Sequence, residues 1–177
     1  MKKFLDASHV RIAIGEIAKM ARGKNIRPVL AGGNAMQIYG SDRLTTDVDF
    51  LASAVPTEIV VEKPLSFGGV SGRSPGGFPV DIIVRNDDFA ELYASAQNDP
   101  IEMGLPVPVV KPEYLAAMKL VAGRAKDEED LKSLIRLEAI DLGKTREIIR
   151  KHLGAFAVKE FGSFVDEVAW RKSRGEE

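Results

Sequence analysis

Two aspartates that follow a pair of glycines by about a dozen positions could support metal-assisted phosphate chemistry. Asp47 and Asp49 are separated only by Val48. In a strand, alternate side chains point to opposite faces, so the two carboxylates share a face while Val48 and Phe50 point into the core. Carboxylates held side by side repel each other, and a divalent cation with oxygen ligands relieves that repulsion. The pair therefore indicates a metal site.

The glycines Gly32 and Gly33 follow the apolar segment 29–31 and precede a short helical segment. A glycine turn at this point presents backbone N–H groups at a helix N-terminus, where a phosphate binds favourably. Asn34 comes next, and its side-chain amide can also donate. Alone, the glycines could be only a tight turn. With the aspartates at this distance, they predict a phosphate site beside a metal site, as metal-assisted phosphoryl or nucleotidyl transfer requires.

A third carboxylate, Asp81, stands between Val80 and Ile82 in an apolar segment. An isolated buried charge is very costly. Asp81 therefore either faces solvent on an edge strand or joins the metal site, and we favour the metal site.

Lys119 is the only charged residue from Tyr114 to Ala122, in a predicted helix that is apolar nearly all round. Such a helix is buried on most of its faces. The lysine ammonium then either extends to solvent or points into an anionic cleft, and a triphosphate would suit such a cleft.

Two arginines could each have either of two roles. Arg43 and Arg124 are candidate phosphate contacts, or surface ion pairs that contribute little stability. Asp127 at an N-cap, with Asp130 three residues later, approximates a capping box at the start of a helix.

These residues resemble the nucleotidyltransferase superfamily of DNA polymerase beta type. That superfamily is marked by a Gly-Gly or Gly-Ser turn, an Asp-x-Asp or Asp-x-Glu pair and a third acidic residue on a later strand. The segments 111–120 and 123–131 are similar to the AbiEii-type branch, which contains toxins of bacterial toxin–antitoxin and phage-defence systems. The resemblance covers roughly residues 28–135.

The resemblance implies transfer of a nucleoside monophosphate from a nucleoside triphosphate such as ATP to an acceptor hydroxyl, with release of pyrophosphate. It implies two Mg²⁺ ions, or Mn²⁺ in their place, bound by Asp47, Asp49 and Asp81. The catalytic residues would be these three and Lys119. The nucleotide contacts would be Gly32, Gly33, Asn34, Arg43, Lys119, Arg124 and Asp130. Many family members place Ser where this chain has Gly33, which puts the strength of triphosphate binding in question.

The implied acceptor is RNA, particularly a tRNA end, or a protein side chain, and the AbiEii-type resemblance adds a cognate antitoxin. Two alternatives stay open. One is a non-catalytic module that binds a nucleotide or a partner. The other is transfer to a small molecule such as an aminoglycoside, for which the acidic run 127–130 could form the acceptor pocket.

Composition fits a globular protein without proving any activity. The chain has 177 residues, of which 45% are hydrophobic and 29% charged, and its formal net charge is −1. That charge argues against an extended basic surface for nucleic acid, although a short groove for a 3′ end would suffice. Absence of cysteine excludes disulfides and cysteine-ligated zinc. The segment after Met1 lacks the apolar core of a signal peptide, and no apolar run is long enough to span a membrane, so we expect a cytoplasmic protein.

The pattern of elements predicts an α+β fold, with a mixed, mostly antiparallel sheet flanked by helices and a C-terminal helical bundle closing one side of the cleft. We expect a nucleotidyltransferase core over residues 1–110 and a helical subregion over 111–177, packed together as one structural unit. The expected strands are 29–31, 47–52, 59–62, a hairpin over 67–77 leading into the Asp81 strand, and an edge strand at 107–110. In the first part of the chain we expect a helix over 8–22 with Ser8 as its cap, a short helix over 34–39, and a helix that Asp87 or Asp88 caps and that ends near residue 96. In the last part we expect helices over 112–124, 127–140, 144–152 and 155–172.

Overall fold

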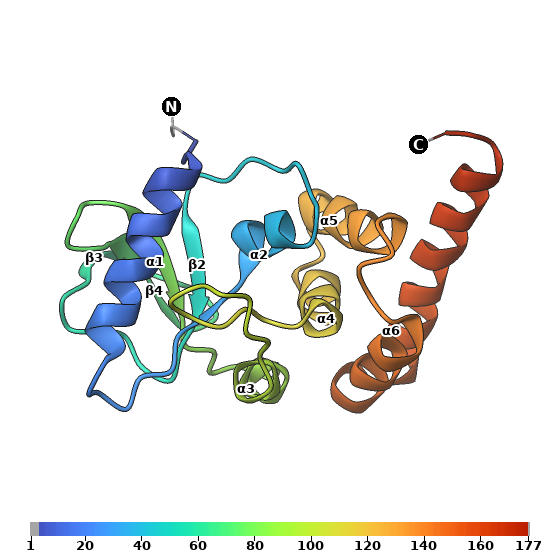
Figure 1. The fold of residues 1–177 in the computed structure, drawn as a ribbon. Coiled ribbons are helices and arrows are strands. Elements are labelled where there is room, and N and C mark those ends of the chain that lie inside the picture. The colour runs from blue at the N-terminus through green and yellow to red at the C-terminus, as the bar shows by residue number, and fades with distance from the viewer. Residues whose placement is uncertain (1–3, 177) are drawn as a thin grey trace. The chain divides into compact units, whose positions relative to one another are not determined.

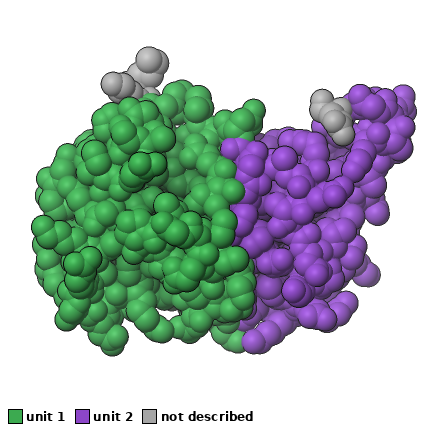
Figure 2. Space-filling view, in the orientation of Figure 1, with its two compact units in different colours: residues 1–38, 42–111 green, residues 39–41, 112–177 purple. Residues whose placement is uncertain are grey.

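The computed structural model describes residues 4–176 and divides them into two compact units. The first unit comprises the residues up to Ile38 together with Asp42–Lys111, and the second comprises Tyr39–Ser41 and the residues from Pro112 onward (Figure 2). Residues 1–3 lie outside the described residues. They belong to the opening segment in which the sequence predicts no signal peptide. Packing of the two subregions into one structural unit stays a prediction.

A five-stranded mixed sheet forms the centre of the first unit (Figure 1). Its strands are β1 Val29–Leu30, β2 Val48–Leu51, β3 Val60–Pro64, β4 Gly69–Arg73 and β5 Pro79–Ile83. They lie in the order β1-β2-β5-β4-β3, in which only the β2–β5 pair is parallel. The prediction of an α+β fold with a mixed, mostly antiparallel sheet is confirmed.

The glycine-rich segment 67–77 supplies β4, which pairs antiparallel with β5. The predicted hairpin, whose second arm carries Asp81, is therefore confirmed. Gly69 shows why glycine is needed here: its φ is +93°, and a Cβ atom on it would lie 2.0 Å from the carbonyl oxygen of Ile82. Only glycine accepts both that backbone conformation and that close approach.

Helix α1, Ala7–Ala21, packs against this sheet, and the buried residues of both elements follow the expected periodicities. The helix buries Ala13, Ile14, Ile17, Met20 and Ala21, while β2 and β5 bury Val48, Phe50, Val80 and Ile82. The predicted cap is wrong: Asp6, not Ser8, begins this helix, because its carboxylate accepts from the backbone N–H groups of Ser8 and His9.

Two further predictions in the first unit need correction. Helix α3, Ala90–Asn98, has Phe89 at its N-cap without a side-chain bond, while the Asp87 carboxylate pairs with Arg85 and accepts from the N–H of Phe89, one residue before the helix. Residues 107–110 form only isolated bridges, from Val109 to Leu30 and to Ile101. Prolines at 106 and 108 lack the N–H groups that a longer ladder needs.

Three helices build the second unit: α4 Pro112–Ala122, α5 Ala125–Arg136 and α6 Leu142–Ser173. Helix α5 begins two residues before its predicted start and ends four before its predicted end. Helix α6 joins the two predicted helices, but Gly154, at φ 87° and ψ 179°, interrupts it at the predicted junction. Among the described residues, no helix has the length and apolar content to cross a membrane.

Candidate active site

Asp49 and Asp81 lie directly opposite each other on the parallel strands β2 and β5. Both side chains are half-buried, while Val48, Phe50, Val80 and Ile82 are buried on the other face of the sheet. Directly opposed residues on neighbouring strands share a face, and such strands are about 4.8 Å apart. The two carboxylates therefore occupy the same face of the sheet, one strand apart.

Asp47 lies one residue before β2 and is held by the threonines that precede it. Thr45 Oγ1 donates to the Asp47 carbonyl oxygen at 2.8 Å, and Thr46 Oγ1 donates to Asp47 Oδ2 at 3.3 Å. The alternation of half-buried Asp47 and Asp49 with buried Val48 agrees with the predicted shared face. Thr45, which is itself buried, is a supporting residue that the sequence did not single out.

The glycine turn is in direct contact with this acidic face. Gly32 has φ +58°, and a Cβ atom placed on it would lie 1.8 Å from Asp49 Oδ2. The Ala31 N–H also donates to the Asp49 carbonyl oxygen at 2.9 Å. Any side chain at position 32 would displace the Asp49 carboxylate, so the turn and the acid are brought together by the absence of a side chain.

The loop before β2 folds back onto the same turn. A Cβ atom on Gly33 would lie 3.1 Å from Thr45 Oγ1 and 3.6 Å from Arg43 Nε. Gln37 fixes this arrangement, because its Nε2 donates to the Arg43 carbonyl oxygen at 2.6 Å. The structure thus places Arg43 beside the glycine turn, and Gln37 is a second supporting residue that the sequence did not reveal.

Asn34 lies within helix α2, Gly32–Ile38, and its side chain is directed inward rather than toward a ligand. Only 2% of the residue is exposed, and its Nδ2 donates to Gln37 Oε1 at 3.2 Å. Its Oδ1 is buried without a hydrogen-bond partner among the described residues. A phosphate at this turn would therefore meet backbone N–H groups, since the Asn34 side chain is buried.

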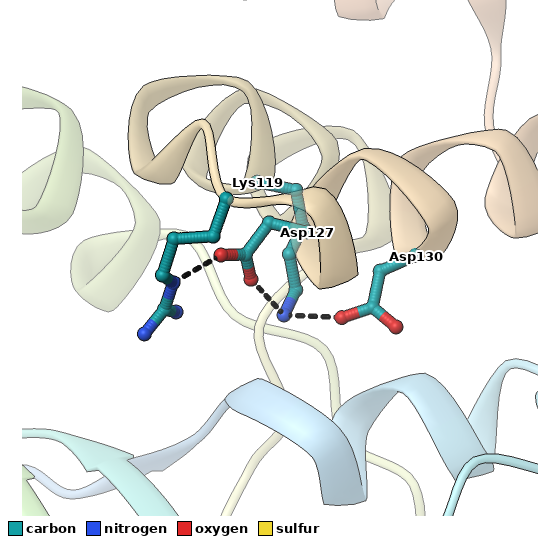
Figure 3. A network of polar contacts seen from close by, with 4 residues as sticks. Lys119, Asp127 and Asp130 are labelled. Atoms are coloured by element: carbon teal, nitrogen blue, oxygen red, sulfur yellow. Dashed lines mark hydrogen bonds and ion pairs between the residues drawn. The ribbon is translucent and has the colours of Figure 1, made fainter.

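Lys119 lies in the second unit and has a different environment from either alternative that its sequence suggested. Its side chain is 9% exposed, and its Nζ lies 3.0 Å from Asp127 Oδ1 and 2.6 Å from Asp130 Oδ2 (Figure 3). Arg124 pairs with the second oxygen of Asp127. We call these four residues the Lys119 network; its two cations balance its two carboxylates.

This network corrects the prediction of a capping box. The N-cap of α5 is Arg124, and Asp127 is the third residue of the helix, with its side chain directed to Lys119 and Arg124. Burial raises the pKa of the Asp127 carboxyl, but the hydrogen bond from Arg124 and the charge of Lys119 outweigh this and hold it below its ordinary value. A role for Lys119, Arg124 and Asp130 toward a nucleotide stays a prediction.

A half-buried tyrosine, Tyr39, also has a shifted pKa in the second unit. Burial, and then the nearby charge of Glu113, raise the pKa of Tyr39 to about 12. Its phenol is therefore neutral at physiological pH and can serve only as a hydrogen-bonding group there.

The chemistry of the three aspartates suits a hard cation such as Mg²⁺, which prefers carboxylate oxygens. The contact between Gly32 and Asp49 adds a second fit, because it brings the backbone of the glycine turn directly beside a carboxylate that could bind a cation. Within residues 4–176, however, no three His, Cys, Asp or Glu side chains already converge in the manner of a metal-binding group. The fit therefore rests on strand register and ligand chemistry.

Comparison with known proteins gives a likeness in fold. No protein-family profile and no curated protein matches the sequence. The crystal structure of an antigenic nucleotidyltransferase-like protein from Paracoccidioides brasiliensis is similar, with a TM-score of 0.50 and 18% identity, over 93% of this chain and 95% of that one. A structure described as a "putative nucleotidyltransferase from H. pylori" has a TM-score of 0.49 and 16% identity, over 98% of this chain and 100% of that one.

The fold is thus that of nucleotidyltransferase-like proteins, and the sequence prediction of that architecture is confirmed. At 18% identity the likeness concerns the fold alone. The AbiEii-type branch and the identity of the substrates stay predictions.

Proposed function

We propose that this protein is a metal-dependent nucleotidyltransferase whose chemistry takes place on the face of β2 and β5. The observation that carries the proposal is the contact between Gly32 and the Asp49 carboxylate, with Asp81 directly opposite Asp49 on the next strand. The backbone turn at Gly32 can bind phosphate, and the acids on β2 and β5 beside it can bind a cation. A nucleoside triphosphate with Mg²⁺ matches both parts.

In the proposed reaction, an acceptor hydroxyl oxygen forms a bond to the α-phosphorus of a nucleoside triphosphate such as ATP. The bond between the α-phosphorus and the bridging oxygen to the β-phosphate breaks, pyrophosphate leaves with that oxygen, and the hydroxyl proton passes to solvent. Asp47, Asp49 and Asp81 would hold Mg²⁺, which when bound supplies positive charge to the phosphates and the acceptor oxygen.

The remaining residues of the turn bind and orient the nucleotide. The backbone N–H groups at Gly32 and Gly33 would donate to the terminal phosphates, and Arg43, whose position Gln37 fixes beside Gly33, would add a positive charge. Because the chain has Gly33 where many family members have serine, no side-chain hydroxyl at that position contributes to this binding.

The proposal also concerns the acceptor of the nucleotide and the biological role of the protein. An RNA or tRNA 3′ end is the acceptor suggested by the AbiEii-type resemblance, with a protein hydroxyl as the other choice. Action as a toxin paired with an antitoxin rests on the same resemblance. The idea of an aminoglycoside acceptor loses its support, because Asp127 and Asp130 of the acidic run are paired with Lys119, and Glu129 is paired with Lys132.

One observation favours the alternative of a non-catalytic nucleotide-binding module. Asn34 is directed inward, so the turn offers the triphosphate only backbone donors on its own side. Such a module would bind a nucleotide without transferring it, and the same experiment separates the two functions.

The test is transfer of label from α-labelled ATP, GTP, CTP or UTP, with Mg²⁺, to total RNA or to RNA-free protein. We expect incorporation and equimolar pyrophosphate, and a loss of at least a hundredfold in the double variant Asp47→Asn, Asp49→Asn. Asp88→Asn, an exposed aspartate of the same unit, is the matched control and should be fully active. Nucleotide binding without transfer would instead support the non-catalytic module.

A further inference from the structure

The acidic row of the site continues across the sheet into a basic edge. Strand β5 pairs with β4 on its other side, so that Asp81 lies opposite Ser71, and Ser71 in turn lies opposite Lys63 of β3. Directly opposed residues share a face. Asp49, Asp81, Ser71 and Lys63 therefore form one row on the proposed catalytic face, which we call the acceptor row.

The charge changes sign along the acceptor row. Two strand spacings separate the backbones of Asp81 and Lys63, about 10 Å. Lys63 is exposed and Ser71 is half-buried, and neither the ammonium nor the hydroxyl has a hydrogen-bond or ion-pair partner in the described part of the chain. The Lys63 ammonium can therefore lie on the same face as the Asp81 carboxylate and several ångströms away from it.

Arg73 adds a second cation to the same face of β4, two residues beyond Ser71. Its Nε pairs with Glu62 at 2.7 Å, and its Nη1 donates to the Gly77 carbonyl oxygen at 2.9 Å. These contacts fix Arg73, whereas Lys63 keeps all three of its donors for a ligand.

We propose that the acceptor row is a subsite for a single-stranded RNA 3′ end, an inference that rests on the proposed function. The terminal hydroxyl would lie beside Asp81, Ser71 would exchange a hydrogen bond with the ribose 2′-hydroxyl, and Lys63 would bind the phosphate that precedes the terminal nucleotide. A polynucleotide carries an anion at a fixed distance from its reacting hydroxyl, whereas a protein hydroxyl carries none. The positive charge beyond the third carboxylate therefore favours RNA over protein.

A structural explanation of Lys63 competes with this one. Strand β3 lies at the edge of the sheet, its pairing with β4 is irregular between Val61 and Lys63, and Pro64 follows. Bulges, lysines and prolines on edge strands prevent edge-to-edge association. That explanation predicts that loss of the charge changes self-association and leaves RNA binding unaltered.

The test measures binding of a fluorescein-labelled single-stranded RNA with a free 3′-hydroxyl to the full chain in Mg²⁺, without nucleotide. We expect Lys63→Glu to weaken binding about tenfold to a hundredfold, the range of a lost charged hydrogen bond. Lys63→Gln should weaken it less and lower the slope of log affinity against log salt by about one. Ser71→Ala should weaken RNA binding several-fold but not binding of the DNA of the same sequence.

Lys159→Glu is the matched control, because Lys159 is an exposed lysine of α6 in the other unit, and it should bind RNA as the wild type does. The same affinity in wild type and Lys63→Glu would overturn the proposal, as would an RNA affinity lowered equally by Lys159→Glu. A change only in oligomeric state on size-exclusion chromatography would also overturn it, in favour of edge protection. Because binding is measured without turnover, a failure of the proposed transferase activity would appear separately, as bound RNA that gains no label.

Discussion

Gly32 has a role that its neighbours cannot share, because its missing side chain provides the space that the Asp49 carboxylate occupies. We predict that Gly32→Ala displaces this carboxylate and abolishes nucleotide binding in calorimetry. The positive φ adds about 1–2 kcal/mol of destabilisation. Gly23→Ala is the control: Gly23 also has a positive φ, +76°, but a Cβ atom there would meet nothing within 4 Å. It should lose similar stability and keep binding, and loss of binding in both variants would contradict the contact.

Asp81 should act in turnover rather than in nucleotide binding, since it is one strand further from the glycine turn than Asp49. We expect Asp81→Asn to keep ATP affinity within about twofold and to lower the rate of label transfer about a hundredfold or more. Measuring both quantities on the same preparation decides the matter. A fully active Asp81→Asn enzyme would remove Asp81 from the site.

At the scale of residues, the sequence predicts which side chains share a face of a strand, because alternation determines this. It does not predict side-chain positions that depend on hydrogen bonds in loops and turns. The shared face of Asp47 and Asp49 follows from alternation, and Asp81 joins them because its strand lies beside β2 in the sheet. The inward direction of Asn34 depends on Gln37, and the position of Asp47 depends on Thr45. Such local hydrogen bonds have no periodic pattern that could reveal them.

Helices α4 and α5 are joined by the Lys119 network, in which the charged side chains pair with one another. Replacing Lys119 with Met would remove the ammonium that pairs with both buried carboxylates, and breaking a buried ion pair costs about 3–5 kcal/mol. We therefore expect a large fall in the free energy of unfolding by urea, largely restored when Asp127→Asn and Asp130→Asn are added. Lys159→Met should be nearly neutral. If Lys119→Met were as stable as the wild type, the ion pairs of the Lys119 network would not be formed in solution.

The network also predicts how stability depends on pH. Since the pKa of Asp127 in the folded protein lies below its ordinary value of 3.8, its contribution is fully present above pH 3.8. The contribution is lost as the pH falls through the lowered pKa. We predict that the difference in unfolding free energy between wild type and Asp127→Asn is largest near pH 6 and shrinks toward pH 2–3. A difference that grew on acidification would show that the pKa is raised instead.

At the scale of elements, helix ends were the weakest part of the sequence prediction. Asp6 caps α1 in place of Ser8, because several nearby residues can satisfy the same N–H groups. Helix α5 begins before Asp127, at an N-cap, Arg124, that makes no side-chain hydrogen bond to the helix. Gly154 did mark a break in α6, as a glycine with positive φ commonly does. The Lys119 network was not predicted, since it depends on how α5 lies against α4.

For the whole molecule, the pattern of short strands followed by helices was enough to predict the α+β fold that a nucleotidyltransferase-like structure also has. Sheet order was not predictable, because β5 inserts between β2 and β4 through long-range pairing. The chain crosses between its two compact units at residues 38–39, 41–42 and 111–112. Only the last crossing lies near the predicted boundary at 110–111, and the first two have no counterpart in the prediction. The predicted single structural unit remains to be tested by the cooperativity of unfolding.

The central claim is that Asp47 and Asp49 bind a divalent cation together with a nucleotide. The most direct measurement is calorimetric titration of ATP, in Mg²⁺ or Mn²⁺, into the wild type, Asp88→Asn and the double variant Asp47→Asn, Asp49→Asn. We predict equal binding by the first two and none by the third. The third should be as stable as the wild type or slightly more so, because two like charges have been removed. Equal ATP binding by all three proteins, with the same dependence on the cation, would contradict the site.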